Sequence, residues 1–204
     1  MSPNQAVRGV RARARQAMRA EVAAAVQDLV LERGYDETTI DDICATAEIS
    51  RSTFFRYFPS KEDALFGETV DAGDHLRDAL VARPPSEEPW VAMRRALDAL
   101  IEEYEGHDER TRRLTRLIVS TPALAARHRE KNGLWLELLR PEVARRIGAD
   151  PADGSDPRAH AVIAAALGCV EAALTAWTAS AQPQPLSTIL DRAMGAPAGL
   201  TAAS

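Results

Sequence analysis

The chain has 204 residues, of which 46% are hydrophobic and 27% are charged. This length and apolar content are sufficient for one medium domain or two small domains with a buried core, and they exclude an intrinsically disordered chain. The formal net charge is −5, yet residues 1–20 contain five arginines and no acid, so a basic segment precedes an acidic body. Because attraction to phosphate is screened over about 10 Å, this local charge fits a DNA-binding head. A solvated, frayed arm is the alternative interpretation.

The composition favours an all-α protein without an export signal or a membrane span. Good helix formers dominate, and no run of alternating β-branched residues is long enough for a sheet. Cys44 and Cys169 lie far apart inside apolar helical patterns, so buried free thiols are expected rather than a disulfide or a metal site. Residues 1–20 are polar where a signal peptide would be apolar, which favours a cytoplasmic location. The segment Ala161–Ser180 is long enough to cross a bilayer, but Glu171 at its middle favours burial inside a bundle.

The first predicted elements are one long helix and one short helix. Apolar residues at intervals of three and four predict an amphipathic helix from Arg13 to Arg33, which Gly34 terminates. Thr39 is expected to cap a second helix at Ile40–Ala47, with Asp42 as the acidic partner in a capping box.

A third short helix follows the three-residue turn 48–50. Ser50 is expected to cap it, and it is predicted at Arg51–Phe58 because Pro59 prevents continuation. A fourth helix opens with a second capping pair and is predicted at Ser60–Leu80. Two short helices joined by such a turn match the helix-turn-helix geometry that reads the major groove. The spacing alone is only moderately specific, since short three-helix packings also occur in proteins with no nucleic-acid role.

The rest of the chain predicts further helices separated by loops rich in proline, glycine and charge. The loops are predicted at 83–89 and 148–158. The helices are predicted at 90–104, around 114–118, at 122–147 with a kink or break at Pro141, at 161–180 and at 186–194, and a frayed tail is expected from Gly195.

The segment Gly34–Leu65, GYDETTIDDICATAEISRSTFFRYFPSKEDAL, strongly resembles the DNA-binding domain of the TetR family of bacterial regulators. The similarity rests on the Thr-Thr opening, the alanine before the turn, Ser50 and the block Thr53–Glu62. One departure is Glu48, where many members carry glycine. A left-handed backbone there would cost a non-glycine residue about 1–2 kcal/mol, so a slightly different turn is expected.

The third helix is expected to have an inward face and a face for DNA. Phe54 and Phe58 are four residues apart and should pack inward with Ile43 and Leu29, whereas Arg56 should face solvent or phosphate. Carried over position by position, the resemblance implies direct contacts with DNA. The residues expected to approach bases are Arg51, Ser52, Thr53 and Phe55, and those expected to contact phosphates are Thr39, Tyr57 and Lys61. A cap, a ring covering the fourth helix and a solvated charge are the alternatives for the last three.

The resemblance implies a DNA-binding domain with a basic arm at residues 1–66 and a helical effector-binding and dimerisation domain at 67–204. One recognition helix reads few base pairs, so a symmetric homodimer is expected to hold two of them about 34–36 Å apart on double-stranded operator DNA. The predicted helix at 161–180 is the best candidate for the interface, and a core helix of a monomer is the alternative. Its small residues, which permit close approach of a second copy, are Ala165, Gly168, Ala172 and Ala176.

The resemblance also implies a small-molecule pocket among the later helices. An apolar or acyl-type effector is the hypothesis, although each pocket residue is also a plausible core residue. The expected pocket residues are Met93, Leu97, Leu117, Trp135, Leu138 and Trp177. The cations that either hold an anionic head group or solubilise the surface are Arg112, Arg113, Arg116, Arg127 and Arg129.

Other functional classes have weaker support in the sequence. It contains no nucleophile elbow, glycine-rich phosphate loop, paired-histidine helix motif or cysteine metal cluster, so neither an enzyme nor a cofactor is expected. The four histidines are scattered in polar surroundings and are expected to be exposed. The function indicated is a ligand-responsive repressor, with a transcriptional activator or an all-helical protein-interaction module without DNA binding as alternatives. Salt-dependent binding to promoter DNA would discriminate the last of these.

Overall fold

The computed structural model describes residues 3–67, 69–105, 109–180 and 184–201, and within these ranges every regular element is a helix. The predicted all-α fold is therefore confirmed. The chain divides into two compact units, Met1–Thr69 and Val70–Ser204.

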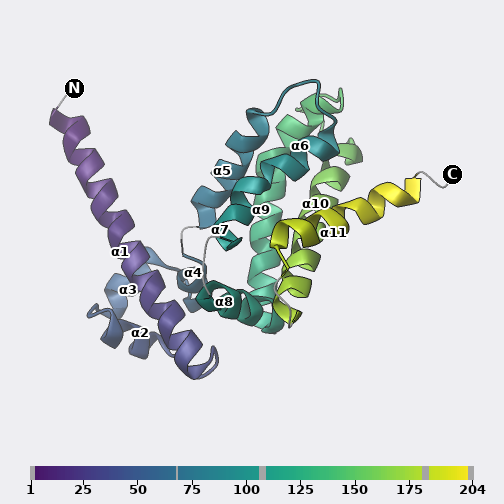
Figure 1. Cartoon of the computed structure of the whole chain (residues 1–204). Helices are drawn as coiled ribbons and strands as arrows, with labels where there is room; N and C mark the ends of the chain where they lie inside the picture. The colour runs from purple at the N-terminus through teal and green to yellow at the C-terminus, as the bar shows by residue number, and fades with distance from the viewer. Residues whose placement is uncertain (1–2, 68, 106–108, 181–183, 202–204) are drawn as a thin grey trace. The chain divides into compact units, whose positions relative to one another are not determined.

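The N-terminal unit consists of four helices. Three short helices pack around the C-terminal half of one long helix (Figure 1). Their bounds are α1 (Pro3–Arg33), α2 (Ile40–Thr46), α3 (Arg51–Tyr57) and α4 (Lys61–Phe66). Helix α1 begins ten residues earlier than the apolar periodicity indicates, and the good helix formers of residues 3–12 are two alanines, two arginines and one glutamine.

Side-chain caps fix where the three short helices begin. The Thr39 hydroxyl accepts a hydrogen bond from the backbone N–H of Asp42 at 3.2 Å, and the Asp42 carboxylate accepts one from the N–H of Thr39 at 2.9 Å. This is the capping box that the sequence predicts. Ser50 and Ser60 cap α3 and α4 in the same way, each accepting from an N–H three residues later at 3.1 Å. Each cap satisfies an amide that helix geometry leaves without a partner.

The turn between α2 and α3 keeps a left-handed backbone at Glu48, so the expectation that it would avoid this conformation is wrong. Glu48 has a φ of +52°, and the N–H of Ile49 donates to the carbonyl of Cys44 at 2.9 Å. A left-handed glutamate costs about 1–2 kcal/mol relative to glycine. The turn keeps this conformation because capped helices fix the chain on both sides.

The core of the N-terminal unit is built on the inward face of α3. Phe54 and Phe58 are both fully buried, with ring centroids 5.9 Å apart, and Ile43 and Leu29 are buried with them. The predicted orientation of α3 is therefore confirmed. Its opposite face is left for solvent or a ligand.

The C-terminal unit is a bundle around α10 (Figure 1). Helix α10 packs against α6, α8, α9 and α11, and it buries ten of its own residues. The helices of this unit are α5 (Thr69–Val81), α6 (Pro89–Ala96), α7 (Asp98–Glu105), α8 (Glu109–Ser120), α9 (Pro122–Arg146), α10 (Pro157–Ala179) and α11 (Leu186–Thr201). By length and hydropathy α10 also qualifies as a membrane span, but 44% of its most apolar window is buried inside the unit, as expected for a bundle helix.

Several helix predictions beyond α3 differ from the structure. The single helix expected at 60–80 is α4 and α5, because Gly67 ends α4 with a φ of +61°. The helix expected at 90–104 is divided at Leu97 into α6 and α7. Pro141 lies inside α9 without breaking it, since buried residues on both sides hold that helix in the bundle. Helix α11 continues past Gly195 to Thr201, where a frayed tail was expected.

Both cysteines are free and buried, as predicted. Burial raises the pKa of the Cys44 and Cys169 thiols, which keeps both protonated and unreactive. Among the described residues, no cluster of histidine, cysteine and carboxylate side chains is arranged to hold a metal ion.

Candidate nucleic-acid interface

The outward face of α3 presents both polar and apolar groups. Arg51, Ser52 and Phe55 are exposed, and the Phe55 side chain is 46% exposed even though it is a large aromatic group. The Phe55 ring meets the edge of the buried Phe54 ring at a centroid distance of 5.4 Å, which fixes its orientation. Thr53 is half-buried and lies within hydrogen-bond distance of the Ser50 hydroxyl, at 3.0 Å. These are residue types that read base edges. Arginine can donate two hydrogen bonds to a guanine, serine can form a hydrogen bond through its hydroxyl, and phenylalanine can make an apolar contact.

Arg51 is held in place by a carboxylate on the preceding helix. Its Nη1 lies 2.7 Å from Oδ1 of Asp41, and both side chains are more than half exposed. Exposed ion pairs of this kind contribute roughly 0–1 kcal/mol. Asp41 therefore orients Arg51. Exchanging Asp41 for a guanine or a phosphate as the partner of Arg51 costs little free energy.

The three residues expected to contact phosphate lie in different environments. Thr39 is exposed, with its hydroxyl engaged in the α2 capping box. Tyr57 is half-buried beside α1. The Lys61 ammonium donates to the backbone carbonyls of Tyr35 and Thr38, at 2.7 and 2.9 Å, and lies 3.9 Å from the centroid of the Tyr35 ring. Lys61 thus ties α4 to the loop before α2, and it is not the freely solvated charge of the alternative interpretation.

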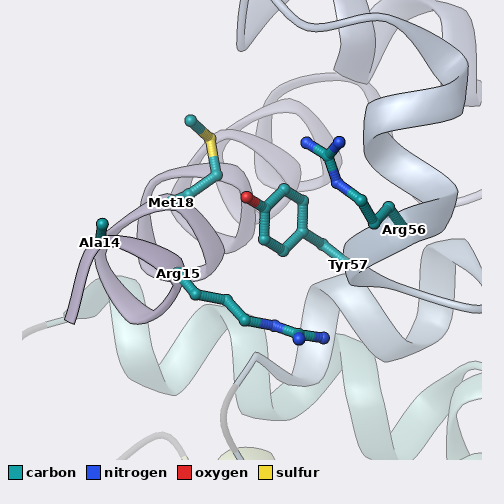
Figure 2. Close-up of a pocket in the computed structure, with 5 residues that line it drawn as sticks. All are labelled: Ala14, Arg15, Met18, Arg56 and Tyr57. Atoms are coloured by element: carbon teal, nitrogen blue, oxygen red, sulfur yellow. The ribbon is translucent and has the colours of Figure 1, made fainter. Parts of the chain in front are cut away.

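A group of arginines lies at the end of α3, and its α1 members are not among the DNA-contacting residues predicted from the sequence. Figure 2 shows the Tyr57 ring between the side chains of Arg15 on α1 and Arg56 on α3, beside a surface pocket of about 350 Å³. The guanidinium carbons of Arg15 and Arg56 lie 5.9 and 5.2 Å from the ring centroid. Arg19 donates to the Tyr57 carbonyl at 2.5 Å and stacks 4.6 Å from the Phe58 ring centroid. The sequence signals for this group are the five arginines without an acid in residues 1–20 and the four-residue spacing of Arg15 and Arg19.

In the C-terminal unit, the structure brings together four of the six expected pocket residues. Met93, Leu97, Trp135 and Trp177 are buried in one hydrophobic cluster. The remaining two, Leu117 and Leu138, are partly exposed and lie outside that buried set.

Gly73 on α5 makes room for Trp135. A Cβ atom at position 73 would lie 2.6 Å from the indole Nε1, which is closer than packed atoms approach. The absence of a side chain therefore allows α5 and the Trp135 ring of α9 to meet. This glycine was not singled out from the sequence, because its role depends on a residue far along the chain.

Two of the arginines considered either for an anionic head group or as surface solubilisers donate hydrogen bonds to backbone carbonyls of the protein. Arg112 donates to the carbonyls of Trp177, at 2.8 Å, and Ser180, and Arg116 donates to that of Thr178 at 2.7 and 2.9 Å. These carbonyls belong to the last turn of α10, where backbone acceptors have no helical partner and cations are favoured.

The other arginines in that set also make protein contacts. Arg127 pairs with Glu130 at 2.7 Å, and Arg129 lies 3.8 Å from Glu171. Arg113 is exposed and likewise has an interaction within the protein.

Helix α9 carries two titratable groups in low-dielectric surroundings. His128 is 8% exposed, so the expectation that every histidine is exposed is wrong for this residue, whereas His75 and His160 are exposed. His107 lies outside the described residues. Burial, with the nearby charges of Lys131 and Arg129, lowers the pKa of His128 to about 4.

Lys131 follows one turn later on α9. It is partly buried, and desolvation lowers its pKa to about 8. Its ammonium lies 4.5 Å from the centroid of the Trp135 ring. Lys131 therefore places a cation beside the hydrophobic cluster that contains four of the expected pocket residues.

The small residues of α10 form an exposed stripe. Ala165, Gly168, Ala172 and Ala176 are all exposed. A groove of about 500 Å³ lies between the C-terminal part of this stripe, at Ala172 and Ala176, and α11, where its lining includes both Ile189 and Arg192. A stripe of small side chains permits close approach of another helix.

This architecture defines a class of protein. A helix-turn-helix with an exposed reading face, followed by a separate helical unit, is the organisation of a DNA-binding transcriptional regulator. Residues 22–68 match the model of the bacterial regulatory proteins of the tetR family, and residues 87–198 match the model of the MftR C-terminal domain. The chain belongs to the TetR family of transcriptional regulators, which are not enzymes.

Individual relatives show the same relationship over most of their length. The chain is 30% identical to the HTH-type transcriptional regulator TcmR of Streptomyces glaucescens over 168 residues, which is 79% of this chain and 74% of TcmR. It is 28% identical to the regulator EthR of Mycobacterium tuberculosis over 83% of this chain and 80% of EthR. Among solved structures, Thermus thermophilus FadR, a TetR family transcriptional repressor in complex with lauroyl-CoA, matches with a TM-score of 0.54 and 25% identity. That match covers 87% of this chain and 91% of FadR.

Proposed function

We propose that this regulator is a cytoplasmic repressor that binds operator DNA as a homodimer and is released by a small apolar or acyl-type effector. The observation that carries the proposal is the division of α3 into two faces. Phe54 and Phe58 anchor one face in the core, whereas Arg51, Ser52 and Phe55 stand exposed on the other. A helix held in this way presents base-reading groups without having to reorganise.

Replacing Arg51 by alanine tests the base contact. The expected loss is about 1–3 kcal/mol of operator binding, roughly 5-fold to 150-fold in Kd, with relaxed specificity at one base position. The measurement is fluorescence anisotropy with operator and random duplexes at fixed salt. Arg145→Ala is the matched control, because Arg145 is also an exposed arginine paired with a carboxylate. Equal affinities for Arg51→Ala, Arg145→Ala and the wild type would show that Arg51 does not read DNA.

The homodimer proposal rests on the exposed stripe of α10. Ala172→Glu is expected to place a charge at the centre of the proposed interface, converting the protein to monomers and weakening operator binding by at least about 100-fold through the loss of bivalency. Sedimentation velocity and duplex binding measure the two effects. Ala126→Glu, at an exposed position of α9, supplies the same charge as a control. A dimeric, operator-binding Ala172→Glu variant would place the interface elsewhere.

The effector proposal rests on the hydrophobic cluster of the C-terminal unit and on the acyl-CoA bound to the FadR relative. The cluster offers apolar surface for an acyl chain, and Lys131 supplies a partly buried cation beside Trp135 for an anionic head group. Such an effector releases DNA only if it binds the DNA-incompetent arrangement more tightly than the competent one.

A thermal-shift screen with fatty acids, lauroyl-CoA and polyaromatic compounds tests the effector class. Lauroyl-CoA is expected to raise the melting temperature and to release bound operator duplex. The Lys131→Met variant is expected to respond less to it because the cation is missing. Stabilisation by polyaromatic compounds alone, with no response to any acyl compound, would contradict an acyl-type effector.

A further inference from the structure

We propose that Arg15 and Arg56, on either side of Tyr57, form a clamp for one backbone phosphate of the DNA, so that α1 contributes to binding together with the helix-turn-helix. This inference rests on the proposed operator binding and adds a second element to it. The clamp is defined by these three residues.

Two positive charges flank the Tyr57 ring. The guanidinium carbons of Arg15 and Arg56 both lie within 6 Å of its centroid. Both side chains are exposed, and among the described residues neither is paired with a carboxylate. Arg33 and Arg51 of the same unit do have carboxylate partners. Two neighbouring arginines that share no acid repel each other and attract an anion, and arginine forks match the oxygens of a phosphate.

The Tyr57 ring contacts both cations. At 5.9 and 5.2 Å the guanidinium groups of Arg15 and Arg56 are within cation–π distance of the ring, and both remain exposed to a ligand. Arg19 connects α1 to the end of α3, because it donates to the Tyr57 carbonyl and stacks on the buried Phe58 ring. The adjoining pocket of about 350 Å³, lined by Ala14 and Met18 with the clamp itself, opens to solvent beside the Tyr57 ring (Figure 2).

The position of the clamp also favours DNA. The clamp lies at the C-terminal end of α3, the helix proposed to enter the major groove, where the flanking DNA backbone passes. Residues 1–20 carry five arginines and no acid, so the sequence that precedes and includes Arg15 is basic. Continuous DNA backbone is therefore the anion that best matches this segment.

The test compares two arginines of α1 that lie two residues apart and therefore on nearly opposite sides of the helix. Operator affinity is measured at several salt concentrations for the wild type, Arg15→Ala and Arg13→Ala, with Arg13 as the exposed control. Loss of one phosphate contact is expected to lower the slope of log K against log salt by about 0.9 and to weaken binding about fivefold to tenfold at 0.1 M salt. The loss should be equal for operator and random duplexes, because phosphate contacts carry no sequence information.

Two further measurements distinguish phosphate binding by Arg15 from a purely structural role of this residue. Arg15→Lys keeps the charge and is expected to retain most of the wild-type slope, and melting curves of the exposed-site variants should match the wild type. Equal slopes for Arg15→Ala and Arg13→Ala, or a slope lost in Arg15→Lys as well, would overturn the clamp. Arg15-dependent stabilisation by inorganic phosphate without any change in DNA binding would also overturn it. If the wild type binds no duplex, the proposed operator binding fails, which is a different result.

Discussion

Replacing Phe54 by alanine is expected to destabilise the N-terminal unit by about 3–5 kcal/mol, because a fully buried ring is removed from its core. The Phe54 ring also contacts the rings of Phe58 and Phe55, so the variant removes support from the exposed face of α3. Chemical denaturation followed by circular dichroism measures the loss of stability. Operator binding should disappear at temperatures where the N-terminal unit is unfolded.

Phe55→Ala is the matched control for that variant. It removes the same atoms from the adjacent position of α3, but from a side chain that is 46% exposed. Its stability should stay within about 1 kcal/mol of the wild type, whereas its operator affinity should fall, because Phe55 is proposed to meet a base. Equal destabilisation by the two substitutions would mean that α3 does not have one buried and one exposed face.

Acidification from pH 7 to pH 4 is expected to remove up to about 3 kcal/mol of stability through His128 alone. The pKa of His128 is about 4 in the folded chain, against 6.5 for an unperturbed histidine, so the unfolded state binds more protons between these values. The contribution is fully present above pH 6.5 and is lost as the pH falls toward 4. The physical cause is burial of the imidazole inside the C-terminal unit, reinforced by the charges of Lys131 and Arg129.

The comparison with His128→Gln isolates this contribution, because glutamine is polar but does not titrate. The free energy of unfolding is measured for both proteins by urea denaturation at several pH values. The wild type should lose up to about 3 kcal/mol more than the variant over this window, since carboxylate effects are common to both. Parallel curves for the two proteins would mean that the imidazole takes up its proton without leaving the core.

The features that the sequence predicts correctly are local. The caps at Thr39, Ser50 and Ser60 involve residues three positions apart, and the inward face of α3 follows from the four-residue spacing of Phe54 and Phe58. Such interactions require only helix geometry, so their outcome can be worked out from neighbouring residues.

The features that the sequence predicts poorly depend on contacts between distant segments. His128 is flanked by polar residues along the chain, yet packing of α9 within the bundle buries it. Arg112 is part of a basic run, but its partners are carbonyls at the end of α10. The stacking of Arg15 on Tyr57 joins α1 to α3. Each of these environments depends on contacts between distant segments. Such contacts cannot be worked out from residue type and local spacing alone.

The central claim is that α3 reads the sequence of duplex DNA. Its most direct test is selection of bound duplexes from a random-sequence library by the purified, effector-free protein, followed by sequencing. We expect enrichment of a two-fold symmetric site whose half-sites are separated by about one helical turn or a multiple of it. Recovered duplexes with no sequence preference over the starting library would contradict it.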